Sequence, residues 1–197
     1  LTRLVGSEMC IRDRCWSGAL ASNLGSSWPI VFTAALSVVL YIYSPMLKGR
    51  GIVGNLAVSM CVAALLVWAR MATGRPLDLT GNADQMWLLA TVTLWGLNVT
   101  REWVKDVQDL RGDAEAKHRT MALRLTPDQN HKGIAICCVL CSGLGFWFSS
   151  ILHNLSWPMC LWAGASLGCL LAAFRFKVTS LSAWIKVLMG LLFVLMV

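Results

Sequence analysis

The sequence predicts an all-α polytopic membrane bundle, with about six complete transmembrane helices and a truncated one at the N-terminus. Of its 197 residues, 57% are hydrophobic and only 14% are charged, and the mean hydropathy is +0.63. About a quarter of the residues of an ordinary soluble domain are charged. Here the charges are clustered and long stretches carry none, which is typical of a protein that crosses a membrane several times.

The expected spans follow from these uncharged stretches, because one helical crossing needs roughly 20 apolar residues. Residues 15–24 make only about half a span, so the chain is expected to begin inside a helix. A polar turn around Asn154 and Pro158 divides a stretch that is too long for one crossing. The predicted complete spans are residues 29–47, 52–69, 84–103, 133–152, 157–174 and 181–197.

Residues 1–14 stand apart from this pattern. Segment 7–14 (SEMCIRDR) resembles translated sequencing-adapter read-through, so we treat residues 1–14 as a non-native tag and exclude them from the fold prediction. Together with the half-span, this leads us to expect a gene fragment that lacks its N-terminal part.

The basic residues predict the orientation of the chain. When the spans alternate in direction, eleven lysines and arginines fall on one side, against Arg70 and Arg75 on the other. The positive-inside rule then places the long loop from 105 to 132 in the cytoplasm. The net charge of +7 is thus mostly an orientation signal, and no nucleic-acid partner is expected.

The cysteines do not predict a metal site. Six of the eight fall inside predicted spans, and the spacing of a zinc ribbon is absent. Cysteine in an apolar helix packs as a small hydrophobic residue, so we expect these side chains to fill the bundle interior.

Acidic residues are concentrated after the third complete span, where five of the ten occur between Glu102 and Glu115. At 100° per residue, Glu102, Asp106, Asp109 and Asp113 fall within about 60° of one another on a helix. We call these four residues the acidic stripe. Like charges at this spacing are destabilising unless they are compensated.

Two interpretations of the acidic stripe are open. Nearby lysines and arginines favour a solvated helix end with many salt bridges. Alternatively, the stripe is half of a magnesium diphosphate site, because Mg²⁺ binds one or two carboxylates together with waters and a substrate phosphate.

Further residues suited to binding a phosphate follow on the same predicted side. Lys48 can neutralise a phosphate and Tyr43 can donate a hydrogen bond, although alone the two are more typical of an interfacial anchor. Gly112 is expected to end the regular helix. Beyond it come further cationic and donor groups: Lys117, His118, Arg119 and Arg124.

These motifs, in this order, resemble the UbiA superfamily of intramembrane prenyltransferases. Segment 105–113 (KDVQDLRGD), followed by Arg119-Thr120, is similar to the family's second aspartate-rich motif. Segment 43–48 (YSPMLK) and Gly54-Asn55 resemble the part that precedes and opens its central helix. Residues 15–197 fit the C-terminal two-thirds of that domain, closest to the branch of digeranylgeranylglyceryl phosphate synthase and homogentisate prenyltransferase.

The resemblance implies magnesium-dependent transfer of a prenyl group from an isoprenoid diphosphate to a lipid or aromatic acceptor in the membrane, among membrane lipids. It implies these roles: metal binding by Asp106, Asp109 and Asp113; catalysis by Asp109, Asp113 and Lys48; diphosphate binding by Tyr43, Lys48, Lys117 and Arg119.

Two features depart from the family pattern. The first aspartate-rich motif, NxxxDxxxD, is absent from this chain, so the fragment alone is expected to be inactive. Lys117-His118 replaces the glycine often found before Arg-Thr. The alternatives are a non-catalytic membrane protein, such as a transporter or scaffold whose stripe binds a cation or a partner, and a degenerate homologue without the first motif.

Overall fold

The computed structural model describes residues 28–42, 51–72, 82–115, 120–151, 156–175 and 178–196. All the secondary structure in these ranges is helical, which confirms the predicted all-α membrane bundle. The helices are α2 (Trp28–Ile42), α3 (Ile52–Ala72), α4 (Asn82–Gln108), α5 (Leu110–Glu115), α6 (Met121–Arg124), α7 (Pro127–Ile151), α8 (Ser156–Phe174) and α9 (Val178–Met196).

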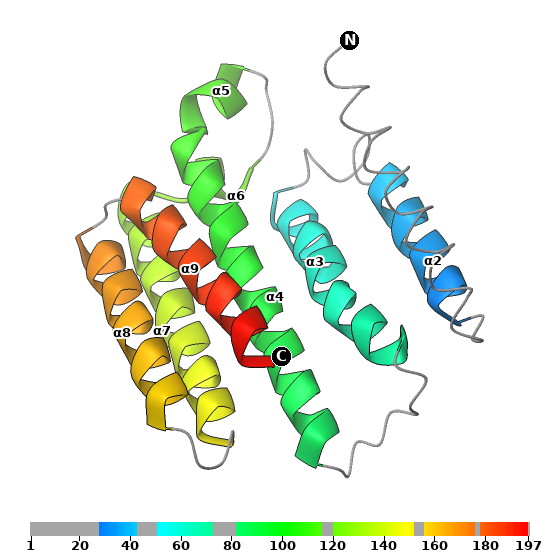
Figure 1. Cartoon of the computed structure of the whole chain (residues 1–197). Helices are drawn as coiled ribbons and strands as arrows, with labels where there is room; N and C mark the ends of the chain where they lie inside the picture. The colour runs from blue at the N-terminus through cyan, green and yellow to red at the C-terminus, as the bar shows by residue number, and fades with distance from the viewer. Residues whose placement is uncertain are drawn as a thin grey trace.

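The six long helices lie side by side and alternate in direction, with α4 at the centre (Figure 1). α4 packs against α3, α7 and α9, while α2 packs on α3, and α8 packs between α7 and α9. The short helices α5 and α6 lie at the end of the bundle where α4 finishes (Figure 1). We call this the α5 end.

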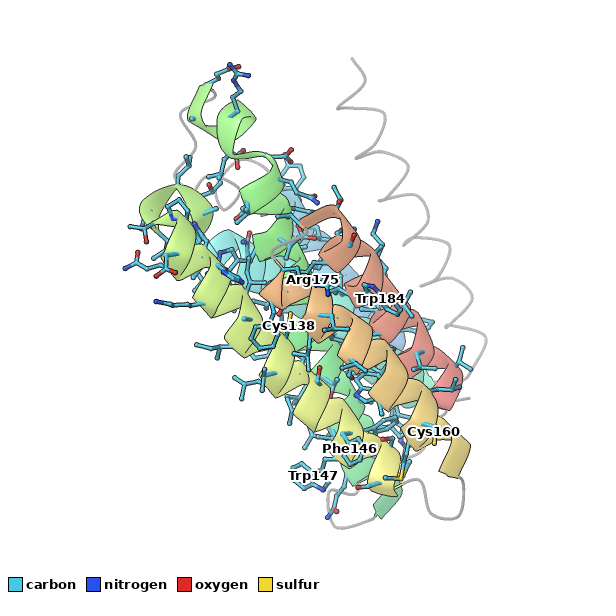
Figure 2. All side chains as sticks on the ribbon, turned by 90° about the vertical axis from the view of Figure 1, so that its left-hand side faces the viewer. Cys138, Phe146, Trp147, Cys160, Arg175 and Trp184 are labelled. Carbon is cyan, nitrogen blue, oxygen red and sulfur yellow. The ribbon has the colours of Figure 1, made fainter. Side chains whose placement is uncertain are left out.

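Length and composition fit a membrane protein. Among the described helices, α3 over Ile52–Arg70 and α7 over Pro127–Ser150 are long and apolar enough to cross a bilayer. Shorter apolar helices cover Ile30–Tyr41, Met159–Phe174 and Val178–Leu192. Large apolar side chains also face outward: Trp147 is 60% exposed and lies at the end of α7 opposite α5 (Figure 2). Such a surface is suited to lipid.

Most of the described basic residues lie at the α5 end, as the predicted alternation of the spans requires. Figure 2 shows Arg175 at the end of α8 that lies toward α5. Arg70, at the end of α3, lies at the opposite end of the bundle. Also at the α5 end, on α4, α5, α6 and α7, are Arg101, Lys105, Arg111, Arg124 and Lys132.

Close packing between the helices relies on tryptophan rings set against glycines. A Cβ atom added at Gly145 would lie 1.8 Å from Trp162 Cζ2, so only glycine leaves room for the ring. Small residues at such contacts let helices in a membrane approach closely. The same arrangement joins α4 to α7, α7 to α8 and α8 to α9, through the pairs Trp103 with Gly133, Trp162 with Gly145, and Trp184 with Gly168.

Candidate functional site

The acidic stripe runs along one face of α4 and continues into α5. The helix is interrupted at Asp109, but the backbone N–H of Asp109 donates to Lys105 O at 2.9 Å. The N–H of Asp113 donates to Asp109 O, also at 2.9 Å. This spacing of four residues is that of an α-helix, so the stripe keeps a shared face across the interruption.

The prediction that Gly112 ends the regular helix is wrong. The interruption falls three residues earlier, and α5 continues through Gly112 to Glu115. A glycine ends a helix by adopting a left-handed conformation. Among the described glycines only Gly51, with φ of 64°, has a positive φ.

Glu102 is the member of the stripe whose charge is compensated. Its Oε1 atom accepts hydrogen bonds from Arg101 Nη1 at 2.6 Å and Lys105 Nζ at 2.7 Å. All three side chains are partly exposed. The interpretation as a salt-bridged helix end therefore applies to Glu102.

Asp106 is held by a neighbouring helix. Asn55, in the first turn of α3, donates from Nδ2 to Asp106 Oδ2 at 2.8 Å. That turn is set by Gly51, whose carbonyl accepts from the N–H groups of Gly54 and Asn55. Partial burial raises the pKa of Asp106 above its usual value, and the negative charges of the other stripe carboxylates raise it further. The hydrogen bond from Asn55 acts in the opposite direction and lowers this pKa. Asp106 is thus a partly desolvated carboxylate that is held by a neutral donor.

Asp109 and Asp113 differ from these two residues. Asp109 is exposed and Asp113 is half-buried, and neither side chain forms a hydrogen bond or ion pair with another described residue. No described residue therefore competes with a ligand for these two carboxylates. The salt-bridge interpretation does not account for them.

The stripe provides carboxylates for a cation without enclosing it. In the described part of the chain, no three His, Cys, Asp or Glu side chains are grouped so that they could hold a metal ion by themselves. Mg²⁺ usually keeps several waters and takes one or two carboxylates plus substrate phosphates. Asp109 and Asp113, which no described residue pairs, can supply the one or two carboxylates of that mode of binding.

Four of the predicted site residues cannot be placed relative to the stripe. Tyr43, Lys48, Lys117 and Arg119 lie outside the described residues. Their roles, and those of the three aspartates, stay predictions.

The chain returning from the stripe is anchored by Asn130, which the sequence analysis did not identify. This buried side chain donates to the carbonyls of Ala122 and Leu125, at 2.9 and 3.3 Å, and accepts from Trp103 Nε1 at 2.8 Å. The segment that includes α6 is thereby tied to α4 directly below the stripe. A capping box between Thr126 and Gln129 begins α7.

At the opposite end of the bundle, Arg70 and Asp84 join α3 to α4. Arg70 donates from Nε and Nη2 to Asp84 Oδ1, at 2.7 and 2.6 Å. Asp84 is only 4% exposed. The two helices that carry Asn55 and Asp106 are thus also fixed to each other far from the stripe.

Comparison with known proteins gives a consistent result. The model of the UbiA prenyltransferase family matches residues 15–196. The digeranylgeranylglyceryl phosphate synthase of Methanopyrus kandleri is 32% identical over 107 residues, which are 54% of this chain and 35% of the relative. The enzyme of the same name from Korarchaeum cryptofilum is 34% identical, over the same shares of each chain.

A longer match is to the digeranylgeranylglyceryl phosphate synthase of Sulfurisphaera tokodaii, which is 25% identical over 134 residues, 66% of this chain and 46% of the relative. The chain thus spans between about a third and a half of the length of these curated relatives. No solved structure matches it. Because the family pattern extends over nearly all of the sequence, the chain belongs to the UbiA prenyltransferase family.

Proposed function

We propose that this chain is part of an integral membrane prenyltransferase that depends on magnesium and transfers a prenyl group from an isoprenoid diphosphate to a lipid acceptor. The observation that carries the proposal is a pair of carboxylates, Asp109 and Asp113, which form no hydrogen bond or ion pair with a described residue and lie beside Asp106 on one helical face. Membership of the UbiA family supports the reaction class.

Asp109 and Asp113 would hold the metal ion, with Asp106 beside them. Bound there, Mg²⁺ would offset the charge of the diphosphate. The predicted cationic and donor side chains, Lys48, Tyr43, Lys117 and Arg119, would bind the diphosphate oxygens directly. Charge-assisted hydrogen bonds of this kind stabilise the negative charge that develops on a leaving group.

In the reaction, the bond between the allylic carbon and the diphosphate oxygen breaks, and its electron pair leaves with the diphosphate. An oxygen of the acceptor forms the new bond to carbon and loses its proton. The apolar helices packed around α4 would keep water away from the reacting carbon. The relatives are named for a product with a glyceryl phosphate group, so we propose a glyceryl phosphate lipid as acceptor in preference to an aromatic one.

The α5 end is proposed to face the cytoplasm. Most of the described basic residues lie there, and the positive-inside rule associates such an excess with cytoplasmic ends. The donor diphosphate would then reach the stripe from the cytoplasmic side.

The metal assignment is tested by titrating Mn²⁺ into the detergent-purified chain and measuring free Mn²⁺ by electron paramagnetic resonance. Asp109→Asn and Asp113→Asn should each weaken binding at least about tenfold, because each removes a charged oxygen ligand. Asp128→Asn is the matched control: Asp128 is an exposed carboxylate at the same end of the bundle and is paired with Lys132 at 2.7 Å. Unchanged affinity in both stripe variants would contradict the metal assignment.

The reaction is tested in full-length protein, with a labelled prenyl diphosphate and a glyceryl phosphate lipid. Loss of transfer in Asp109→Asn and Asp113→Asn, but not in Asp128→Asn, is the expected result. A protein that binds Mn²⁺ but neither transfers the label nor binds the diphosphate would favour the transporter or scaffold alternative.

A further inference from the structure

Within the described residues, Asp106 is the one member of the acidic stripe that is bonded to another long helix. Glu102 is paired with its neighbours on α4, Arg101 and Lys105. Asp106 instead accepts a hydrogen bond from Asn55 of α3, a residue 51 positions away in sequence. The UbiA motif does not by itself explain why a neutral amide is placed against this carboxylate.

The chemistry of the contact gives a reason. The amide of Asn55 donates to Asp106 Oδ2, and Oδ1 accepts no hydrogen bond from a described residue. One such bond limits rotation of the carboxylate and leaves the other oxygen available. Because the Asn55 amide is neutral, it fixes the Asp106 carboxylate without cancelling its negative charge. At Glu102, by contrast, Arg101 and Lys105 do offset the charge of the carboxylate.

We propose that Asn55 is a positioning residue, which holds the Asp106 carboxylate in the orientation needed to act beside Asp109 and Asp113 on a divalent cation. The inference rests on the proposed function. Partners that orient metal-binding carboxylates from outside typically change metal affinity by 10- to 100-fold when they are lost.

The same pair of helices provides a matched control. One turn farther along α3, Ser59 lies against Asn98 of α4, and Asn98 Nδ2 donates to Ser59 Oγ at 3.3 Å. Both side chains are buried. This contact also joins α3 to α4 through a hydrogen bond donated by an asparagine amide, but its acceptor is a hydroxyl and no carboxylate of the stripe takes part. If Asn55 only held the two helices together, removing Asn98 should lower Mn²⁺ affinity as much as removing Asn55 does.

The experiment measures Mn²⁺ affinity by electron paramagnetic resonance in the detergent-purified chain. Asn55→Ala should weaken binding about tenfold, while Asn98→Ala should leave it within about twofold. Asn55→Leu is the second variant: it removes the donor, nearly keeps the side-chain size and suits an apolar helix if the alanine variant folds poorly. Both Asn55 variants should bind Mn²⁺ equally weakly.

A double-mutant cycle tests whether Asn55 acts through Asp106. In the Asp106→Asn background, adding Asn55→Ala should cause no further loss of Mn²⁺ affinity, because the carboxylate that it orients is absent. Additive losses, or wild-type affinity in both Asn55 variants, would overturn the inference while leaving the proposed function intact. If the wild-type chain bound no Mn²⁺, or Asp109→Asn and Asp113→Asn kept full affinity, the proposed function would fail, and this inference with it.

Discussion

Replacing Gly145 by alanine is expected to destabilise the bundle strongly, although alanine is ordinarily the better helix former. The added Cβ would lie 1.8 Å from Trp162 Cζ2 and 2.1 Å from its Cε2 atom, about half the 3.4–4 Å of an ordinary contact. Trp162 is completely buried, and its Nε1 donates to Ser142 O at 3.1 Å. The ring cannot move away without breaking that bond and disturbing the core.

The magnitude follows from these two effects. Overpacking a well-packed interior typically costs about 1–3 kcal/mol, and a lost hydrogen bond costs about 1 kcal/mol. We therefore expect Gly145→Ala to lower the free energy of unfolding by about 3 kcal/mol, which is on the order of a 100-fold change in the unfolding equilibrium.

Gly143 provides the control on the same helix. It is exposed, and a Cβ there would have no neighbour within 4 Å. Gly143→Ala should be neutral or stabilise the helix by up to about 1 kcal/mol. Unfolding of both variants by sodium dodecyl sulfate, followed by far-ultraviolet circular dichroism, measures the difference. Equal stabilities of the two variants would refute the reasoning.

Two further predictions concern charged groups. Arg70→Met alone should destabilise the fold by about 3 kcal/mol, because it removes the cation that is paired with the buried Asp84 carboxylate, and adding Asp84→Leu should recover most of that loss. Equal unfolding transitions for the single and double variants would show that the carboxylate is not the cause. Burial raises the pKa of Asp106 above its ordinary value of 3.8, so the folded protein holds this proton more tightly than the unfolded chain does. The resulting contribution to the stability of the metal-free protein is complete below pH 3.8 and is lost as the pH rises through the raised pKa. In thermal unfolding with chelator, Asp106→Asn should therefore be as stable as the wild type below pH 3.8 and more stable than the wild type at pH 7. A variant that is less stable than the wild type at pH 7 would contradict the raised pKa of Asp106.

The sequence was sufficient for the helical class and for the alternating directions, because apolar length and basic clusters determine both in a membrane. It was less informative about where helices end. The predicted membrane span 84–103 is shorter than α4, which ends at Gln108, since a helix does not have to stop where the membrane does. Gly112 was misjudged because a glycine ends a helix only when its backbone turns left-handed.

The candidate site could be predicted only in part. The shared face of the stripe follows from helical periodicity within one segment. The contact of Asn55 with Asp106 spans 51 residues, and no periodicity within one helix reveals a partner on another. The salt-bridge interpretation applies to Glu102, while Asp109 is paired with no described residue and leaves the metal interpretation as the prediction there.

The tryptophan and glycine pairs also determine the depth of the site. In lipid, apolar helix surfaces gain little by associating, because the surrounding tails are equally apolar, so shape must decide how far one helix slides past another. A slide of one turn, about 5.4 Å, would place a larger side chain where Trp103 and Trp162 each need a glycine. Trp103 and Trp162 thus fix how far α4, α7 and α8 are shifted along one another. The height at which α4 presents its aspartates, relative to the membrane surface, is therefore set by contacts deep within the bundle.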